Sequence, residues 1–118
     1  MTASNQRFRV AIVGCGIGRS HIVEGYKPNA DKFEVKALCD LNVERMTPIA
    51  DEFGVERRVT NFDDLLAMDD IDIIDVCTPP GLHYPMVMAA LDAGKHVVCE
   101  KPLVGSLAEV DEVIAREK

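Results

Sequence analysis

Short apolar blocks rich in Val and Ile recur along the chain, and segments with helical spacing separate them. The blocks run from Phe8 to Val13, from Phe33 to Cys39, from Ile71 to Cys77 and from His96 to Cys99. Blocks of this length, apolar on both faces, are typical of buried strands in a parallel sheet. The alternation of strands and helices therefore predicts an α/β fold in which helices cover both faces of the sheet.

One intervening segment, Val43–Phe53, predicts a helix from the signals at its two ends. Asn42 suits the N-cap position and Gly54 suits the stop. Pro48 lies inside this segment, where a proline removes a backbone hydrogen bond. We therefore expect either a kink at Pro48 or a restart of the helix with Thr47 as its cap.

Two further helices are predicted in the second half of the chain. Between Tyr84 and Gly94, Pro85 suits a first helical turn and Gly94 suits a left-handed C-terminal cap. Ser106 and Glu109 then form a capping box, in which the Ser106 side chain can accept from the Glu109 amide and the Glu109 side chain can reach back to the Ser106 amide. These signals predict a short helix before the last strand and another after it.

The connections carry their own signals. Arg58–Thr60 is expected to form a short strand, and Asn61 is expected to cap a brief helix that runs through Leu65 and Leu66. The run Met68–Asp72, with its three aspartates, is expected to be a solvated turn before a strand.

Composition places the sequence among ordinary globular proteins. The 118 residues contain 47% apolar and 28% charged side chains, which fits one domain with a core of its own. There are 20 acidic and 13 basic residues, giving a net charge of −7 without any basic run, so nucleic acid and anionic lipid are not expected partners. No apolar stretch approaches the length of a membrane span, and the first residues lack the apolar core of a signal peptide. We therefore expect a cytoplasmic protein.

The four cysteines are Cys15, Cys39, Cys77 and Cys99, and no two of them form a CxxC pair. Thiols in the cytosol stay reduced, so we expect these side chains to be small buried filler. No residue is expected to ligate a metal.

The first strand runs directly into glycines, in the sequence RVAIVGCGIGRSH. Gly14, Gly16 and Gly18, with Ile17 between the last two, allow a sharp strand-to-helix turn and a close approach of backbone amides to a pyrophosphate. The spacing GxGxG is one residue shorter than GxGxxG and puts Arg19 where the third glycine is expected. Which glycine packs the helix on the strand, and whether Arg19 reaches the phosphates, is left open. The context predicts a dinucleotide site.

Asp40 ends the second strand, 22 positions after Gly18. A carboxylate here can hold both hydroxyls of an adenosine ribose and repels a 2′-phosphate, and no Arg or Lys stands at positions 41–43. NAD is therefore favoured over NADP. The alternative interpretation is that Asp40 only caps the helix that follows it.

Two more loops follow buried strands, where ligands bind in doubly wound folds. They read Cys77-Thr78-Pro79-Pro80-Gly81-Leu82-His83 and Cys99-Glu100-Lys101-Pro102. The glycine loop, the TPP-x-x-H loop and the EKP loop, in this order, resemble the N-terminal NAD(P)-binding domain of the Gfo/Idh/MocA family of oxidoreductases over nearly the whole chain. The resemblance implies a Rossmann-like doubly wound parallel sheet in three α/β/α layers, with strand order 3-2-1-4-5.

The same resemblance implies roles for individual residues. Lys101 would be the catalytic lysine, binding and polarising the substrate hydroxyl near the nicotinamide and taking part in the proton relay. Glu100 would lie near the nicotinamide side, and Pro102 would fix the direction of the lysine.

The TPP-x-x-H loop is expected to contribute further cofactor contacts. Thr78, Pro79 and Pro80 would pack along the cofactor ribose, with Pro80 standing where relatives often have Asn. His83 either contacts cofactor or substrate or caps a helix. His21, by contrast, is expected to be a packing histidine of the first helix.

Taken together, these motifs predict one dinucleotide-binding domain, residues 1–118, of an NAD-dependent dehydrogenase acting on a sugar, polyol or related hydroxy compound. The resemblance implies a second domain beyond this sequence, with most of the substrate pocket and a catalytic histidine, and the position of Lys118 inside a predicted helix agrees with that expectation. The longer enzyme is expected to be a homo-oligomer. The competing hypothesis is a stand-alone nucleotide-binding or sensing module without catalysis, which the lysine loop disfavours.

Overall fold

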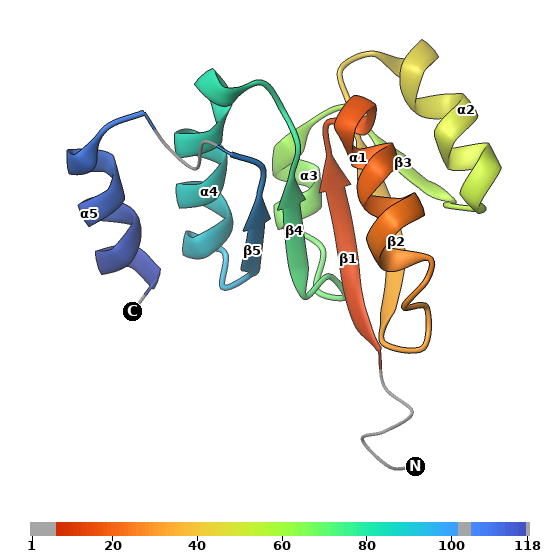
Figure 1. Ribbon diagram of the computed structural model, residues 1–118, viewed down its shortest axis with the longest axis horizontal. Coiled ribbons are helices and arrows are strands. Elements are labelled where there is room, and N and C mark those ends of the chain that lie inside the picture. The colour runs from red at the N-terminus through yellow and green to blue at the C-terminus, as the bar shows by residue number, and fades with distance from the viewer. Residues whose placement is uncertain (1–6, 102–104, 118) are drawn as a thin grey trace.

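The apolar blocks of the sequence form one parallel sheet in the computed structural model, which describes residues 7–101 and 105–117. Its strands are β1 (Phe8–Val13), β2 (Phe33–Cys39), β3 (Arg57–Val59), β4 (Ile73–Val76) and β5 (His96–Cys99). They lie in the order β3-β2-β1-β4-β5, with every neighbouring pair parallel (Figure 1). The predicted fold class and strand order are confirmed. The predicted strand Ile71–Cys77 is shorter than expected, and Pro102 lies outside the described residues.

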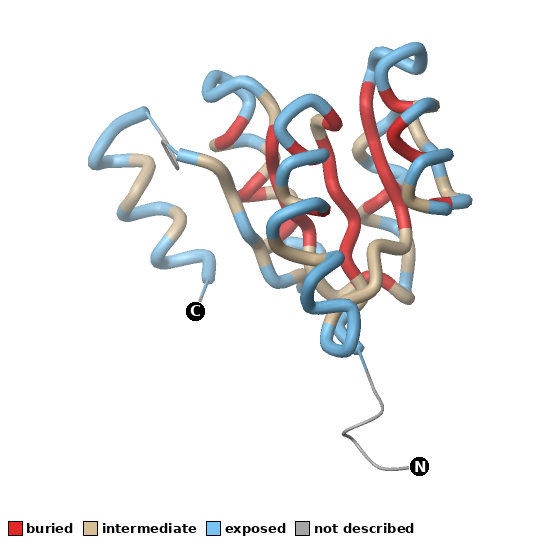
Figure 2. The backbone as a smooth tube through the Cα atoms, turned by 45° about the vertical axis from the view of Figure 1, so that its right-hand side comes forward, coloured by how far each residue is buried: buried red, intermediate tan, exposed pale blue. Residues whose placement is uncertain are grey.

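Helices cover both faces of this sheet. They are α1 (Cys15–His21), which continues into the π-helical turn η2 (Ile22–Tyr26), α2 (Val43–Phe53), α3 (Phe62–Leu66), the 3₁₀ turn η3 (Pro80–Leu82), α4 (His83–Asp92) and α5 (Leu107–Glu117). Val10 and Ile12 of β1 pack in a cluster with residues of α1 and α2, whereas Ala11 and Val13 pack with residues of α3 and α4. The side chains of a strand alternate between the two faces, so this division defines three layers. The buried strands form the centre of the molecule in Figure 2.

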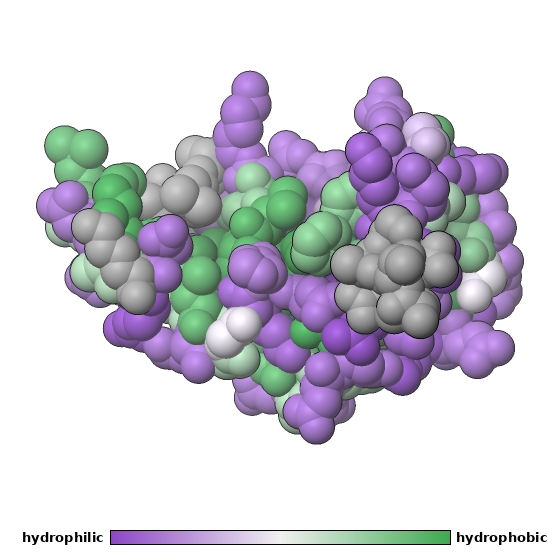
Figure 3. All heavy atoms as spheres, turned by 90° about the horizontal axis from the view of Figure 1, so that it is seen from below, coloured by the Kyte–Doolittle hydropathy of each residue, from purple (hydrophilic) through white to green (hydrophobic). Residues whose placement is uncertain are grey.

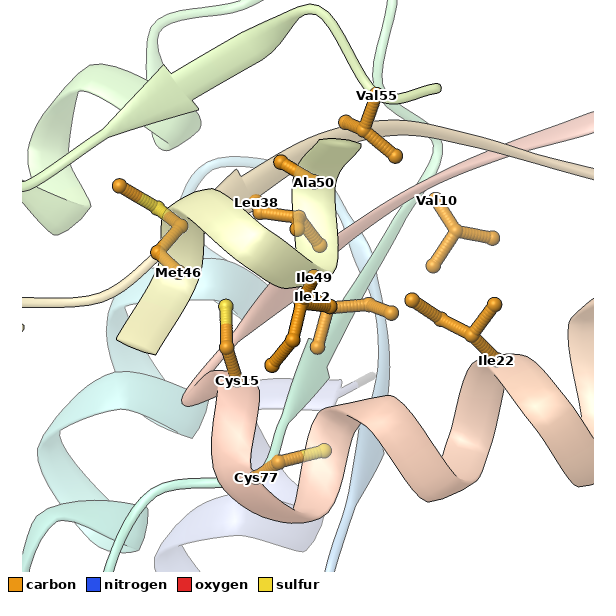
Figure 4. Packing of buried hydrophobic residues seen from close by; sticks show 10 residues of the cluster. All are labelled: Val10, Ile12, Cys15, Ile22, Leu38, Met46, Ile49, Ala50, Val55 and Cys77. Atoms are coloured by element: carbon orange, nitrogen blue, oxygen red, sulfur yellow. The ribbon is translucent and has the colours of Figure 1, made fainter. Parts of the chain in front are cut away.

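The cluster beneath α1 and α2 is drawn in Figure 4. Met46 and Ile49 of α2 approach Leu38 of β2 and Ile12 of β1, and Cys15 lies at the start of α1 beside them. This packing fixes where the loop between β1 and α1 lies on the sheet.

Helix α2 runs through Pro48 as a single element. The Asn42 side chain accepts a hydrogen bond of 3.1 Å from the Arg45 amide, and Gly54 ends the helix with φ 68°. Both predicted ends are therefore confirmed, while the restart capped by Thr47 is wrong. Pro48 is exposed, so the carbonyl left without its helical donor lies on the side of α2 that water can reach.

The signals around the last two helices also appear in the structure. Gly94 adopts φ 78° just after α4, which begins at His83. At α5, Ser106 Oγ accepts from the Glu109 amide at 3.2 Å, but the Glu109 carboxylate accepts from the Gly105 amide instead of the Ser106 amide. The Glu109 side chain therefore caps the amide one residue before the predicted one.

Side-chain hydrogen bonds hold the turn before β4 in place. The Asp72 carboxylate accepts from the Arg9 amide at 2.8 Å and from the Arg9 guanidinium at 3.0 Å. The Lys95 ammonium donates to the carbonyls of Met68 and Ile71, and Ile71 itself is buried. These contacts correct the expectation of a merely solvated turn, because they join the turn to β1 and to the start of β5.

The face at the N-terminal ends of the strands is mostly hydrophilic, with hydrophobic residues gathered toward the α5 side (Figure 3). On α5 itself, Leu107 is 84% exposed and Ile114 is 50% exposed. Among the residues that the structure describes, no helix combines the length and the apolar character needed to cross a membrane.

Candidate functional site

A cleft of about 550 Å³ lies at the carboxyl edge of the sheet, where the loops after β1, β2, β4 and β5 meet. Each of these strands points to the same edge (Figure 1), as parallel strands must. Every predicted cofactor-binding residue except Gly18 lines the cleft: Gly14, Gly16, Ile17, Asp40, Thr78, Pro79, Pro80, His83, Glu100 and Lys101. The fold therefore brings motifs that are far apart in the sequence into one cleft.

Gly14 forms the turn between β1 and α1. Its φ is 91°, and a Cβ atom added there would fall 2.7 Å from the backbone carbonyl of Cys77 and 2.8 Å from the Thr78 amide nitrogen. Only glycine tolerates both the conformation and this close approach. The glycine loop is consequently packed directly against the loop that follows β4.

Gly18 has a different task. It is buried, and a Cβ atom there would fall 2.6 Å from Cγ2 of Ile12, so Gly18 is the glycine that lets α1 pack closely on β1. Arg19 points elsewhere: its guanidinium donates to the Glu52 carboxylate at 3.0 and 2.8 Å and lies over the Phe53 ring. Gly18 is therefore the packing glycine, while the Arg19 guanidinium is engaged by Glu52.

Asp40 directly follows β2 at the cleft, with its side chain only 4% exposed. Its carboxylate accepts two hydrogen bonds of 3.0 Å from the Arg45 guanidinium and bonds of 2.9 Å from the amides of Cys15 and Asn42. Burial alone would raise the pKa of Asp40, but the bonds from Arg45, Asn42 and Cys15 outweigh it and lower that pKa. Asp40 is thus ionised and ties the glycine loop to the start of α2.

Arg45 was not identified from the sequence as a residue of the site. It lies beyond positions 41–43, but the first turn of α2 returns its guanidinium to Asp40, beside the glycine loop; an atom at the Cβ position of Gly16 would lie 3.8 Å from it. The available signal was the N-cap at Asn42, which places residue 45 in the first helical turn. Arg45 also lines the cleft.

The loop Thr78–Pro80 passes along the cleft and leads through η3 into α4. His83 is fully buried, and its Nε2 lies 2.8 Å from the Thr78 carbonyl oxygen. A ring nitrogen that donates to this carbonyl holds the loop in place. His83 is therefore attached to the loop from within the fold.

Glu100 and Lys101 follow β5 and line the cleft. In the strand order, β1 and β4 lie between them and the Asp40 side of the cleft, which follows β2. Lys101 is exposed, and the Glu100 side chain is 33% exposed. The Glu100 carboxylate lies 2.5 Å from Nε2 of His21. That hydrogen bond lowers the pKa of Glu100, against an opposing effect of burial.

His21 is not a simple packing histidine. Its Nδ1 lies 2.6 Å from the carboxylate of Asp75, which is fully buried in β4. Asp75 also accepts from the Tyr26 hydroxyl at 2.7 Å and from the Cys77 thiol at 3.3 Å. An acidic residue inside the apolar block Ile71–Cys77 was the signal in the sequence that a buried polar network lies there.

The cysteines are free thiols, as expected. Burial, together with nearby carboxylates, raises the pKa of Cys15 to about 12 and the pKa of Cys39 and Cys99 to about 11. It also raises the pKa of Cys77. Thiols in such surroundings are poor nucleophiles.

The cleft fits a dinucleotide. Its volume lies within the range usual for small-molecule and cofactor sites, about 300–1,000 Å³, glycines form one wall, and an ionised aspartate stands at the end of β2. A family model described as "Oxidoreductase family, NAD-binding Rossmann fold" matches residues 8–118.

Several known proteins are similar to this chain. The 4-carboxy-2-hydroxymuconate-6-semialdehyde dehydrogenase of Sphingobium sp. is 32% identical over 111 residues, which cover 93% of this chain and 35% of that protein. The myo-inositol 2-dehydrogenase of Thermotoga maritima is 33% identical over 111 residues, covering 93% of this chain and 33% of the relative.

Solved structures agree. GenD2 from gentamicin A biosynthesis, in complex with NAD, superimposes with a TM-score of 0.89 at 29% identity and covers 98% of this chain and 33% of its own. A 3-ketoreductase from Actinomadura kijaniata, in complex with TDP-benzene and NADP, has a TM-score of 0.85 at 30% identity, with 95% and 35% covered.

The chain therefore spans about a third of the length of each of these relatives. The family match extends over almost all of it, and the three motif loops meet in one cleft of the expected fold. This chain belongs to the Gfo/Idh/MocA family of oxidoreductases and comprises its NAD-binding Rossmann domain.

Proposed function

We propose that the cleft binds NAD and that the chain is the cofactor-binding domain of a longer dehydrogenase acting on a sugar, polyol or related hydroxy compound. The observation that carries this proposal is that the glycine, TPP-x-x-H and EKP loops meet around one cleft. Asp40 follows β2 and Lys101 comes after β5, on either side of the central strands β1 and β4. The names of two relatives, D-apiose dehydrogenase and myo-inositol 2-dehydrogenase, support a polyhydroxy substrate.

The two sides of the cleft have different proposed tasks. The adenosine ribose lies at Asp40, whose carboxylate takes the ribose hydroxyls when the Arg45 guanidinium gives up part of its contact. Gly14, Gly16 and Ile17 leave room for the pyrophosphate, and Thr78, Pro79 and Pro80 flank the second ribose. Glu100 and Lys101 lie at the nicotinamide side, and Gly18 supports the loop by packing on Ile12.

NAD is the proposed cofactor because Asp40 is ionised and close to the position of a 2′-phosphate, which it repels. Arg45 offsets part of this repulsion, since its guanidinium pairs with the same carboxylate. The preference for NAD therefore depends on the balance of these two side chains. A similar fold is solved with NAD in one relative and with NADP in another.

Lys101 is the proposed catalytic residue. Its ammonium donates a hydrogen bond to the substrate hydroxyl or carbonyl oxygen, and Lys101 is exposed where it lines the cleft. When bound, NAD supplies the hydride chemistry. In the longer protein, Lys101→Met is expected to abolish turnover while NAD binding is retained, and turnover retained by that variant would contradict the assignment.

The first test is a calorimetric titration of this chain with NAD and, separately, with NADP. NAD is expected to bind saturably and NADP more weakly. Asp40→Ala is expected to weaken NAD binding roughly tenfold, as the loss of a charge-assisted hydrogen bond does. Asp31→Ala, in an exposed segment before β2, removes the same charge away from the cleft and should change nothing. Binding of neither dinucleotide would overturn the cofactor proposal.

Three wider features of the longer protein remain proposals: a second domain carrying most of the substrate pocket, assembly into a homo-oligomer, and a cytoplasmic location. The free thiols agree with a reducing compartment. Sizing of the longer protein in solution tests the oligomer directly.

A further inference from the structure

One imidazole joins the core of the sheet to the cleft. His21 ends α1, and its two ring nitrogens face two carboxylates, one from β4 and one from the loop that follows β5. Nδ1 lies 2.6 Å from Asp75 Oδ2 in the middle of the sheet, and Nε2 lies 2.5 Å from Glu100 Oε2 at the end of β5. The two contacts bring residues 54 and 79 positions away from His21 together.

The proton count of this arrangement is informative. A neutral imidazole has one N–H, so one of the two contacts would set a bare ring nitrogen against a carboxylate oxygen. An imidazolium has two N–H groups and donates to both carboxylates. Asp75 already accepts from the Tyr26 hydroxyl and the Cys77 thiol, so the geometry favours a charged His21 that donates to both side chains.

The two carboxylates differ in how firmly they are held. Asp75 is fully buried and also accepts from the Tyr26 hydroxyl and the Cys77 thiol, so its position is fixed by the fold. Glu100 is 33% exposed and lines the cleft next to Lys101. Because His21 contacts both carboxylates, the fixed position of Asp75 in the core sets where the Glu100 side chain lies at the cleft.

We propose that His21 is a positioning residue: as an imidazolium anchored on Asp75, it orients the Glu100 carboxylate toward the nicotinamide side of the bound cofactor. This inference rests on the proposed function, because it takes the Glu100 side of the cleft to be the nicotinamide side. His21 itself acts through Glu100.

Three titratable groups contact His21 directly: Asp75 of β4, Cys77 just after β4, and Glu100 just after β5. Two more act through these groups, because Tyr26 donates to Asp75 and Lys101 lies beside Glu100. Burial lowers the pKa of His21, but the hydrogen bonds to Asp75 and Glu100 outweigh it, and the net effect raises that pKa. The direction agrees with the geometry. A raised pKa favours the charged form of the ring.

The charge is measured on the chain without any cofactor, by following the imidazole nitrogens of His21 with NMR as the pH is changed. Both nitrogens are expected to keep imidazolium shifts to a pH above that at which histidine titrates in the urea-unfolded chain, about 6.5. A neutral His21 ring at pH 7, or a metal ion found on Nδ1, would overturn the proposal. This measurement needs no substitution, so it holds even if variants at position 21 fold poorly.

The positioning role is tested by binding. His21→Gln keeps a polar side chain of moderate size and removes the charge. It is expected to weaken NADH binding several-fold and to leave binding of ADP-ribose, which lacks the nicotinamide, unchanged. In a Glu100→Gln background the same substitution should have no further effect on NADH binding, because the two residues act as one unit.

Other outcomes have distinct meanings. An equal loss for NADH and ADP-ribose, or additive effects of the two substitutions, would show that His21 only stabilises the fold. Failure of the unsubstituted chain to bind either ligand would overturn the proposed cofactor site, and the NMR result would still report whether His21 is charged.

Discussion

Arg57 of β3 and Asp70 of the turn before β4 are joined by two hydrogen bonds of 2.6 and 2.5 Å. The pairing links an edge strand to a turn near the N-terminal end of the sheet, across the chain segment that contains α3. The Arg57 guanidinium holds the pKa of Asp70 at about 2, below its usual 3.8.

This pair gives a prediction for acid unfolding. Because the folded-state pKa is lowered, the unfolded chain binds the proton more tightly, and the stabilisation is present above about pH 4 and is lost toward about pH 2. Asp70→Asn should therefore lower the urea midpoint at about pH 6 and leave it nearly unchanged at about pH 2. Asp69→Asn, at an exposed neighbour, is the control. A deficit of the same size at both pH values would contradict the assignment.

Gly18→Ala tests the contact between α1 and β1. The added methyl meets Cγ2 of Ile12 inside the core, and overpacking of this kind costs about 1–3 kcal/mol of unfolding free energy. Gly25→Ala, in η2, is the matched control, because no atom lies within 4 Å of the added Cβ. Thermal or urea unfolding measures both variants, and equal stability of the two would show that the close approach is unimportant.

Arg45→Gln tests the balance at Asp40. Removing the guanidinium leaves the carboxylate without its counter-charge, so the ratio of NAD to NADP affinity should rise by several-fold. Arg58→Gln removes a comparable charge from β3, where Arg58 pairs with Asp51, and should leave the ratio unchanged. Titration of both variants with both dinucleotides measures this, and a fall in the ratio for Arg45→Gln would contradict the prediction.

The thiols should be nearly inert in the folded chain. With the pKa of Cys39 and Cys99 raised to about 11, the reactive thiolate is scarce at about pH 8. Alkylation by iodoacetamide, followed by mass spectrometry, is expected to be far slower in buffer than in urea. Rapid native labelling of Cys15 or Cys77, which are both buried, would show that the loops at the cleft open readily.

Much of the fold was predictable because its signals are local. Asn42 and Gly54 define the ends of α2 through backbone geometry that needs no tertiary partner, and Gly94 does the same after α4. The strand order followed from the resemblance, and the positions of Asp40 and Lys101 at strand ends placed them at one edge of the sheet.

What the sequence could not supply were relations between distant segments. Gly18 takes the packing task because α1 approaches Ile12, which spacing alone does not reveal. Arg45 reaches Asp40 only because α2 begins where it does, and His21 meets Asp75 and Glu100 only in the assembled sheet. Each of these depends on an approach between elements instead of on a local pattern.

The exposed position of α5 has a consequence for how evenly the domain resists opening. Of the other elements, α5 packs chiefly on α4, and two exposed side-chain contacts, Arg116 with Asp92 and Tyr84 with Glu112, join the two helices. A helix with so little buried apolar surface separates from the sheet at a lower free energy than the strands do. Backbone amides of α5 should therefore exchange with deuterium well before those of β1, and α5 is the element expected to open while the sheet stays folded.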